Sequence, residues 1–224
     1  MNVLVVVPAY QEEQVIGTVV AELVDLGYRV VVVDDGSIDA TGSRAVSAGA
    51  AVFCHAVNRG QGAALQTGIT AALRMGADVI VTFDADGQHQ VQDITKLLAP
   101  LEAGSADVVL GSRFLPGATS PTIPPLRRLL LRLAVSFDRW RTVLKITDTH
   151  NGLRAFSAAA AAQLYIRQDG MAHASEILDQ IVRLRLRYVE VPVQVRYTEY
   201  ARAKGQRNSG GLSIVRDLFF RRML

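Results

Sequence analysis

Short apolar runs recur along the first half of the chain, most of them bounded by Gly, Asp or Pro. Such runs are typical of strands buried on both faces of a sheet. They lie at residues 3–7, 30–33, 51–53, 79–83 and 108–110. Segments with helical spacing separate them, at about 15–26, 39–48, 63–75 and 94–101. Ser37 or Asp39 is placed to cap the second of these helices. Strands that alternate with helices predict an α/β fold, with a mostly parallel sheet and helices on both faces.

The pattern changes after Arg113, where four prolines within ten residues predict an irregular loop. The expected elements beyond it are a basic amphipathic helix over about 126–144, a strand at 152–156, helices at 158–165 and 173–185, and a strand at 188–195 interrupted by Pro192. A polar, basic tail at 198–211 and a last basic amphipathic helix at 214–224 complete the chain.

The composition fits one globular domain with a sizeable core, because half of the 224 residues are hydrophobic and 20% are charged. The single cysteine, Cys54, excludes an intramolecular disulfide, and a reducing compartment is the simpler interpretation. The first apolar run has no basic flank before it and ends at Pro8, which argues against a signal peptide. No stretch reaches the roughly 18 apolar residues that a membrane span needs.

Charge is distributed unevenly. Residues 1–112 hold 5 Lys and Arg against 13 Asp and Glu, a balance of −8, whereas residues 113–224 hold 19 against 8, a balance of +11. A basic half suggests an anionic partner, such as phosphate, anionic lipid or nucleic acid. An arginine-rich solvated surface is the alternative. Nucleic-acid binding is disfavoured because interleaved stacking aromatics and a known motif are absent from the sequence.

Acidic residues follow two of the predicted strands, at the sheet edge where α/β folds bind ligands. Asp84, Asp86 and Gln88 alternate, so on an extended segment their oxygens project to one side and suit Mg²⁺ or Mn²⁺. The alternative is that the two carboxylates merely cap the next helix. At the neighbouring strand end, Asp34 or Asp35 could accept hydrogen bonds from a ribose or a base edge. The glycine-rich segment at 58–68 is only a weak match to a phosphate-cradling loop.

Four ordered blocks carry a family resemblance: VVVPAYQEE at 5–13, VDDGS at 33–37, DADGQH at 84–89 and GSRF at 111–114. In order and spacing they resemble the family 2 glycosyltransferases with a GT-A fold, and in particular the dolichol-phosphate mannosyltransferase and polyprenyl-phosphate glycosyltransferase branch. DTHNGLRAF at 148–156 resembles a fifth block. Residues 175–178 and the tail at 202–208 are more loosely similar.

The resemblance implies a role for each matching residue. The nucleotide pocket would be lined by Pro8, Ala9, Tyr10 and Glu12, with Tyr10 near the base. The nucleoside would contact Val33 and Asp35. The ribose and diphosphate would face Asp84, Ala85 and Asp86. Asp86 and Gln88 would be the main metal ligands, with Asp84 nearer the nucleotide, and Arg113 would bind a phosphate of donor or acceptor.

The tail departs from the branch's pattern. Arg202 and Gly205 match it, but Asn208 stands where a Lys is usual. Lys204 and Arg207 are nearby cations that could take over the contact with the acceptor phosphate.

The implied reaction is an inverting transfer, in which an acceptor oxygen attacks the anomeric carbon opposite the departing diphosphate. A lipid phosphate acceptor needs no strong base, whereas a sugar hydroxyl must lose a proton. Asp148 is the candidate base, with Glu176 behind it; alternatively, Asp148 is a loop carboxylate that pairs with Arg154. His89 and His150 are expected beside the site and its phosphates. His55 and His173 are expected to be ordinary structural or surface residues.

The sequence therefore predicts one GT-A domain over 1–224, with a nucleotide-sugar half at 1–114 and an acceptor- and membrane-facing half at 115–224. The donor would be a GDP- or UDP-sugar and the acceptor a polyprenyl phosphate, or else a hydroxyl of a lipid-linked or cell-surface glycan. The helix at 126–144 either lies on an anionic membrane surface or packs on the sheet with its arginines solvated. The expected location is the cytoplasmic face of the membrane, as a peripheral protein, with or without a separate integral membrane partner. A non-catalytic nucleotide-binding module is a third possibility, and the intact Asp84, Asp86 and Gln88 set argues against it.

Overall fold

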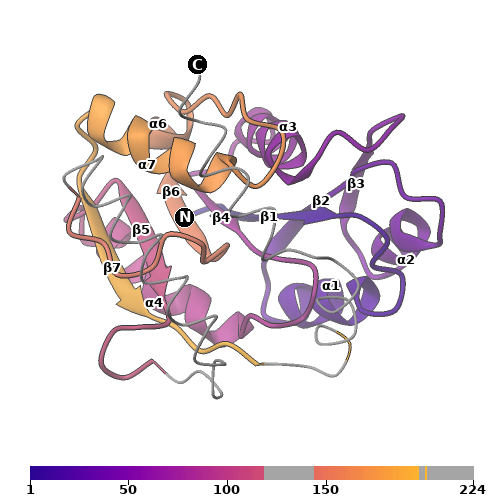
Figure 1. Cartoon of the computed structure of the whole chain (residues 1–224). Coiled ribbons are helices and arrows are strands. Elements are labelled where there is room, and N and C mark those ends of the chain that lie inside the picture. Colours follow the sequence, from indigo (N-terminus) through magenta and orange to yellow (C-terminus); the bar gives the residue numbers. More distant parts are fainter. Residues whose placement is uncertain (119–143, 197–199, 201–224) are drawn as a thin grey trace.

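The computed structural model describes residues 1–118, 144–196 and 200, and it contains a seven-stranded sheet with helices on both faces (Figure 1). The strand order is β3-β2-β1-β4-β6-β5-β7. The strands are β1 (Val3–Ala9), β2 (Arg29–Asp34), β3 (Ala51–Cys54), β4 (Val79–Thr82), β5 (Val108–Ser112), β6 (Arg154–Ser157) and β7 (Tyr188–Pro192). Every pairing is parallel except those that β6 makes with β4 and β5. The predicted mostly parallel α/β fold is confirmed.

The described helices are α1 (Ile16–Asp25), α2 (Thr41–Ser47), α3 (Gln61–Arg74), α4 (Ile94–Glu102), α6 (Ala158–Ala161) and α7 (His173–Arg183). A 3₁₀ turn, η1 (Val91–Asp93), precedes α4. In α2 neither candidate cap bonds as a standard N-cap, because the N-cap residue is Ala40; Asp39 instead accepts a hydrogen bond from the backbone N–H of Thr41 at 3.0 Å.

The apolar runs bury residues on both faces of the sheet, because successive side chains of a strand point to opposite sides. Val5 and Val7 of β1 belong to a core cluster with α1, α2 and α4. Leu4 and Val6 belong to a second cluster, with α3, α6 and α7. Figure 1 shows the two helical layers on opposite sides of the sheet. Helix α3 lies so close to β1 that a Cβ on Gly68 would overlap Cγ1 of Val6.

The antiparallel strand β6 is inserted between β4 and β5. Because it runs in the opposite direction, its amino end lies at the edge where β4 and β5 end. Two hydrogen bonds hold the approach to β6 at this edge: Thr82 Oγ1 donates to the carbonyl of Gly152 at 2.7 Å, and Gly111 N donates to the carbonyl of Leu153 at 2.9 Å. The loop that precedes β6 therefore lies at the edge of the sheet where β1 and β4 end.

Two predicted elements end earlier than expected. The helix expected over 158–165 stops at Ala161, after which the side chain of Gln180 accepts a hydrogen bond from Tyr165 N and donates one to the Tyr165 carbonyl, each at 2.8 Å. The strand expected over 188–195 ends at Pro192. The helices expected at 126–144 and 214–224 and the tail at 198–211 lie outside the described residues, apart from Leu144 and Tyr200. Within the described ranges, every helix is too short or too polar to cross a bilayer.

Candidate functional site

A cavity of about 490 Å³ opens at the carboxyl ends of β1, β2 and β4. Pro8, Ala9, Tyr10, Glu12 and Asp35 line it from β1, β2 and the loops that follow them. Asp84, Ala85, Asp86, Gln88 and His89 line it from the loop after β4. The remaining lining residues are Asn58, Gly60, Gln61, Ala64, Arg113, His150, Asn151, Gly152, Met171 and Val195. All residues expected at the nucleotide and the diphosphate, except Val33, thus share one cavity.

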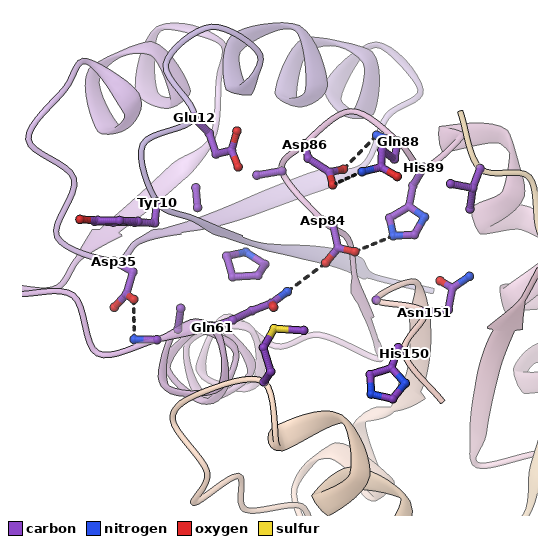
Figure 2. Close-up of a pocket in the computed structure, with 18 of the residues that line it drawn as sticks. Tyr10, Glu12, Asp35, Gln61, Asp84, Asp86, Gln88, His89, His150 and Asn151 are labelled. Atoms are coloured by element: carbon purple, nitrogen blue, oxygen red, sulfur yellow. Dashed lines mark hydrogen bonds and ion pairs between the residues drawn. The ribbon is translucent and has the colours of Figure 1, made fainter. Parts of the chain in front are cut away.

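Asp84 lies between two polar side chains from different elements (Figure 2). His89 Nε2 is 2.9 Å from Asp84 Oδ2, and Gln61 Nε2, at the start of α3, donates to Asp84 Oδ1 at 3.1 Å. Burial alone would raise the pKa of Asp84, but the hydrogen bond and charge of His89 lower it; the same pair raises the pKa of the buried His89. The two residues form an ion pair in the wall of the cavity.

Asp86 bonds to Gln88 alone among the described residues. Asp86 Oδ1 accepts from the backbone N–H of Gln88 at 3.0 Å, and Oδ2 accepts from its side-chain amide at 2.7 Å. Burial and the nearby charge of Asp84 raise the pKa of Asp86 to about 6. A carboxylate that is desolvated in this way would be stabilised by a cation.

Asp35 fixes the loop that leads into α3. Its Oδ1 lies 2.6 Å from His55 Nδ1 and accepts from Arg59 N at 3.0 Å, while its Oδ2 accepts from Gly60 N at 2.6 Å. His55 Nε2 in turn lies 2.9 Å from Thr67 Oγ1, so His55 has the structural role expected of it. Asp34 does not line the cavity; its side chain accepts from Ser37 N at 3.0 Å.

The expectation for the side chain of Val33 is corrected. It is fully buried in the core cluster under α3, where its Cγ2 packs near Gly68. Val33 lies within β2, beneath α3, whereas Asp35 lies just beyond the end of the strand, where it lines the cavity.

The chain after β7 crosses the loop that carries Asp86 and Gln88. Val195 forms an antiparallel bridge with His89, and Arg196 N donates to the Gln88 carbonyl at 2.8 Å. Gln194 N donates to Asp93 Oδ2 at 2.6 Å. These contacts join positions about a hundred residues apart, and local sequence patterns do not predict them.

Tyr200 contacts the loop after β1 beside the cavity. Its hydroxyl donates to Glu12 Oε2 at 2.8 Å and lies 3.3 Å from the carbonyl of Gln11. Burial, followed by the hydrogen bond and charge of Glu12, raises the pKa of Tyr200. A residue far along the chain therefore contacts a predicted donor-pocket residue. Arg202, Lys204, Arg207 and Asn208 lie outside the described residues.

Arg113 and Asp148 form a buried, two-pronged ion pair. Arg113 Nε donates to Asp148 Oδ2 and Nη2 to Oδ1, each at 2.7 Å, and the two side chains are 10% and 1% exposed. The alternative pairing of Asp148 with Arg154 is therefore wrong: Arg154 is buried and donates to the carbonyl of Thr149 at 3.1 Å.

Glu190 of β7 supports this pair from behind. Its carboxylate accepts from Thr147 N at 2.9 Å, from Thr147 Oγ1 at 3.0 Å and from Asp148 N at 3.2 Å. Burial raises the pKa of Glu190, and these hydrogen bonds oppose the rise. Glu176, the second candidate base, accepts from the backbone N–H groups of Arg167 and Gln168 and does not line the cavity.

Comparison with known proteins decides the family. Residues 4–164 match the family model described as glycosyl transferase family 2. The chain belongs to the family 2 glycosyltransferases. It is 33% identical over 242 residues to the UDP-N-acetylglucosamine–dolichyl-phosphate N-acetylglucosaminyltransferase of Methanococcus voltae, covering 99% of this chain and 96% of the relative. It is 31% identical over 222 residues to the undecaprenyl-phosphate mannosyltransferase of Micrococcus luteus, covering 95% and 89%.

Solved structures agree on the fold. The Mycobacterium tuberculosis glucosyl-3-phosphoglycerate synthase, in complex with Mg²⁺ and UDP, superposes with a TM-score of 0.69 at 25% identity, covering 88% of this chain and 71% of that one. The same enzyme has been solved with Mn²⁺ and UDP-glucose. The glycosyltransferase described here therefore has the GT-A fold, and structural neighbours with this fold bind divalent metal and UDP.

The donor set of this glycosyltransferase fits such a metal. The loop after β4 offers two carboxylates and one amide oxygen, which are ligands that Mg²⁺ and Mn²⁺ accept. The described residues contain no group of three His, Cys, Asp or Glu side chains arranged to hold a metal. A cation here would therefore need further oxygens from the substrate, as is usual for Mg²⁺ at diphosphates.

Lining residues of the glycosyltransferase that had no predicted role include Asn58, Gln61, Asn151 and Met171. Three of these lie in segments that the sequence had singled out. The glycine-rich segment at 58–68 contains Asn58 and Gln61, and the block at 148–156 contains Asn151. Met171 follows α6 in a loop that carries no such pattern.

Proposed function

We propose that this glycosyltransferase moves a sugar from a GDP- or UDP-sugar to a polyprenyl phosphate, with inversion at the anomeric carbon and with Mg²⁺ or Mn²⁺. The observation that carries the proposal is that Asp84, Asp86 and Gln88 line one cavity together with Tyr10, Asp35 and Arg113. The two relatives named above, one dolichyl-phosphate and one undecaprenyl-phosphate transferase, support the acceptor class.

The donor's nucleoside would lie at the end of the cavity formed by Tyr10 and Asp35. Tyr10 lines the cavity and supplies an aromatic ring on which the base would stack. Asp35 is already held by His55 and by two backbone N–H groups, which orient its carboxylate toward the ribose or base. Pro8, Ala9 and Glu12 complete this end of the pocket.

The diphosphate would lie against the loop after β4. Asp86 and Gln88 would hold the metal, and Asp84, which His89 and Gln61 already engage, would face the nucleotide-sugar together with Ala85. The metal, when bound, neutralises the charge that develops on the departing diphosphate. The rest of the catalysis would be positioning by this loop, which Val195 and Arg196 hold through backbone contacts with His89 and Gln88.

The acceptor phosphate would bind Arg113. Since Asp148 gives both of its carboxylate oxygens to Arg113, it orients the guanidinium and is not placed as a free general base. A phosphate acceptor needs no base, so this arrangement favours polyprenyl phosphate over a glycan hydroxyl. Further cations for the acceptor would come from Arg202, Lys204 and Arg207.

The two halves of the chain would divide the work much as the sequence suggests, with donor binding mainly in residues 1–114, and with acceptor and membrane contact mainly in residues 115–224 together with Arg113. The protein would lie on the cytoplasmic face of the membrane as a peripheral enzyme. A separate integral membrane protein is a candidate partner there.

Transfer of label into lipid tests the proposal. Purified protein is incubated with radiolabelled UDP-N-acetylglucosamine or GDP-mannose, Mg²⁺ or Mn²⁺, and vesicles with or without polyprenyl phosphate. We expect label in the lipid fraction only when both polyprenyl phosphate and metal are present. Label that enters a free or lipid-linked glycan, but never polyprenyl phosphate, would reject the acceptor and favour the hydroxyl alternative.

A further inference from the structure

Several buried polar atoms at one end of the cavity have no hydrogen-bond partner. Among the described residues they include His89 Nδ1, Thr149 Oγ1 and Asn151 Nδ2. All three atoms belong to the loop after β4 or to the loop before β6, and His89 and Asn151 line the cavity. Buried polar groups are nearly always hydrogen-bonded, so unpartnered buried atoms in two loops beside a cavity point to a polar ligand there.

The amide of Asn151 has a defined orientation. Its Oδ1 accepts from the backbone N–H of Leu153 at 2.9 Å, which identifies the other end of the amide as the NH₂ group. The residue is only 3% exposed, so the side chain is held in place. The part of Asn151 left to bind a ligand is therefore a hydrogen-bond donor.

The loop that carries Asn151 runs directly against Asp84. A Cβ on the next residue, Gly152, would overlap both carboxylate oxygens of Asp84, so the two loops are in van der Waals contact. Figure 2 shows Asn151, His150 and His89 on the side of the cavity opposite Tyr10 and Asp35, with Asp84 between the two sides. If the nucleoside of the donor lies at the Tyr10 end of the cavity, the group attached to the far side of the diphosphate lies at the Asn151 end.

The chemistry of this end suits a hydroxylated ring better than a phosphate. It offers an amide donor, an imidazole and the carboxylate of Asp84, and that carboxylate would repel a second anion. Hydroxyl groups both donate and accept, so a sugar can satisfy all of these groups at once. We propose that this end of the cavity binds the sugar of the nucleotide-sugar, and that the Asn151 amide donates a hydrogen bond to one of its hydroxyl oxygens and so selects the sugar. The assignment rests on the proposed function.

Binding measurements on two Asn151 variants test the assignment. N151D keeps the oxygen that accepts from Leu153 N but removes the donor, and N151A removes both. Affinities for the nucleotide-sugar and for its nucleoside diphosphate alone are measured by calorimetry with Mg²⁺, using whichever of UDP-N-acetylglucosamine and GDP-mannose the unmodified protein binds. We expect both variants to bind the nucleotide-sugar about tenfold more weakly, with less than a twofold change for the nucleoside diphosphate.

N58A is the matched control, because Asn58 lines the cavity without belonging to either loop of the cluster. Its effects on the nucleotide-sugar and on the nucleoside diphosphate should be equal. Deoxy analogues of the donor sugar then identify the hydroxyl: the analogue that lacks it should bind the unmodified protein weakly and show no further loss in N151D. Melting temperatures check that each variant is folded.

Three results would overturn the assignment. The first is an unchanged ratio of the two affinities in both variants. The second is an unchanged ratio with a raised KM for polyprenyl phosphate, which would place the acceptor phosphate at this end instead. The third is failure of the unmodified protein to bind either nucleotide-sugar, and this result would reject the proposed function as well. In the first two cases the unmodified protein still binds the donor and N58A still responds as expected, so only the assignment of the sugar fails.

Discussion

Arg113 donates through Nε and Nη2, along one edge of its guanidinium, to the two carboxylate oxygens of Asp148, and each donor lies 2.7 Å from its acceptor. Lysine cannot reproduce this fork, since it carries a single ammonium group. We expect R113K to lower kcat/KM for the polyprenyl phosphate acceptor by about 10- to 100-fold while donor affinity stays within twofold. R187K is the control, because Arg187 makes a similar pair with Asp107 on the exposed edge of the sheet. Equal acceptor kinetics in R113K and R187K would contradict the prediction.

Removal of Asp148 should also destabilise the fold. D148A leaves Arg113 without its carboxylate at a site where the arginine side chain is only 10% exposed. Breaking a buried pair from one side costs about 3–5 kcal/mol, and we expect a loss of free energy of unfolding in that range. Urea denaturation of D148A and of the double variant D148A/R113M measures it. The double variant should be more stable than D148A. If it is not, the unpaired charge of Arg113 is not the cause of the stability loss in D148A.

Glu190 should act through the Arg113–Asp148 pair rather than on a substrate. In E190Q one carboxylate oxygen becomes an amide that faces the N–H and O–H donors of Thr147. We expect a loss of about 1–3 kcal/mol in stability and a raised KM for the acceptor with an unchanged KM for the donor. D107N is the matched control, since Asp107 precedes β5 and bonds Arg187 just before β7, away from the cavity. It should alter stability alone.

Asp86 is the residue on which metal dependence should rest. Loss of its carboxylate removes one expected ligand and one charge, and we expect D86A to reduce transfer at least about a hundredfold at any Mg²⁺ or Mn²⁺ concentration. D86N keeps the shape of the side chain, and its transfer rate should lie between those of the unmodified protein and of D86A. Metal titrations of initial rates, with EDTA as the zero point, provide the measurement. Full activity of D86A without metal would reject the proposed mechanism.

Two helical glycines should respond oppositely to alanine. In α3 a Cβ on Gly68 would overlap Cγ1 of Val6, and the backbone or core would have to shift at a cost of about 1–3 kcal/mol. In α1 a Cβ on Gly17 would meet no atom within 4 Å, so G17A should be stabilising by up to about 1 kcal/mol through helix propensity. Thermal denaturation of both variants decides; a stabilised G68A would show that α3 does not pack this closely.

His173 should make the protein acid-sensitive. Burial, aided by the charge of Arg154, lowers the pKa of His173 to about 4 from an ordinary 6.5. The folded protein therefore keeps His173 neutral, while the unfolded chain takes up a proton below pH 6.5. Stability from this source is complete above pH 6.5 and is lost as the pH falls toward 4, by roughly 3 kcal/mol in total.

The variant H173N isolates this effect. Its amide nitrogen can still donate to the carbonyl of Gly170, as His173 Nδ1 does at 2.8 Å, but it does not titrate. Melting temperatures measured between pH 7 and pH 4.5 should fall less steeply for H173N than for the unmodified protein. Parallel curves would mean that other groups cause the acid sensitivity.

The sequence predicts local structure well where one pattern decides it. The apolar run at 3–7 became β1 because residues 4–7 are buried between two helical layers, and the spacing of Val19 and Leu23 placed α1 correctly. The acidic loop after β4 was found because strand ends gather at one edge of a parallel sheet. Each of these inferences needs information from only a few neighbouring residues.

Pairing between distant segments is what the sequence did not reveal. Asp148 lies closer in sequence to Arg154 than to Arg113, yet β6 runs antiparallel and turns Arg154 into the core while Arg113, at the end of β5, faces Asp148. Gln61 reaches Asp84 only because α3 packs against β1. Such contacts depend on sheet order, and apolar runs alone do not specify it.

The insertion of β6 between β4 and β5 affects the order in which the strands can pair during synthesis of the chain. A chain emerging from the ribosome offers β4 and β5 before the strand that separates them. β4 can pair with β1 at once, but its second neighbour, β6, is complete only when residue 157 has emerged. The loop with Asp86 and Gln88 waits longer still, for Val195 and Arg196. During that interval the apolar edge of β4 is open to wrong partners. The growing polypeptide can thus pair β1, β2 and β4 early in its synthesis, whereas the loop with Asp86 and Gln88 gains these backbone contacts only after Arg196 has emerged.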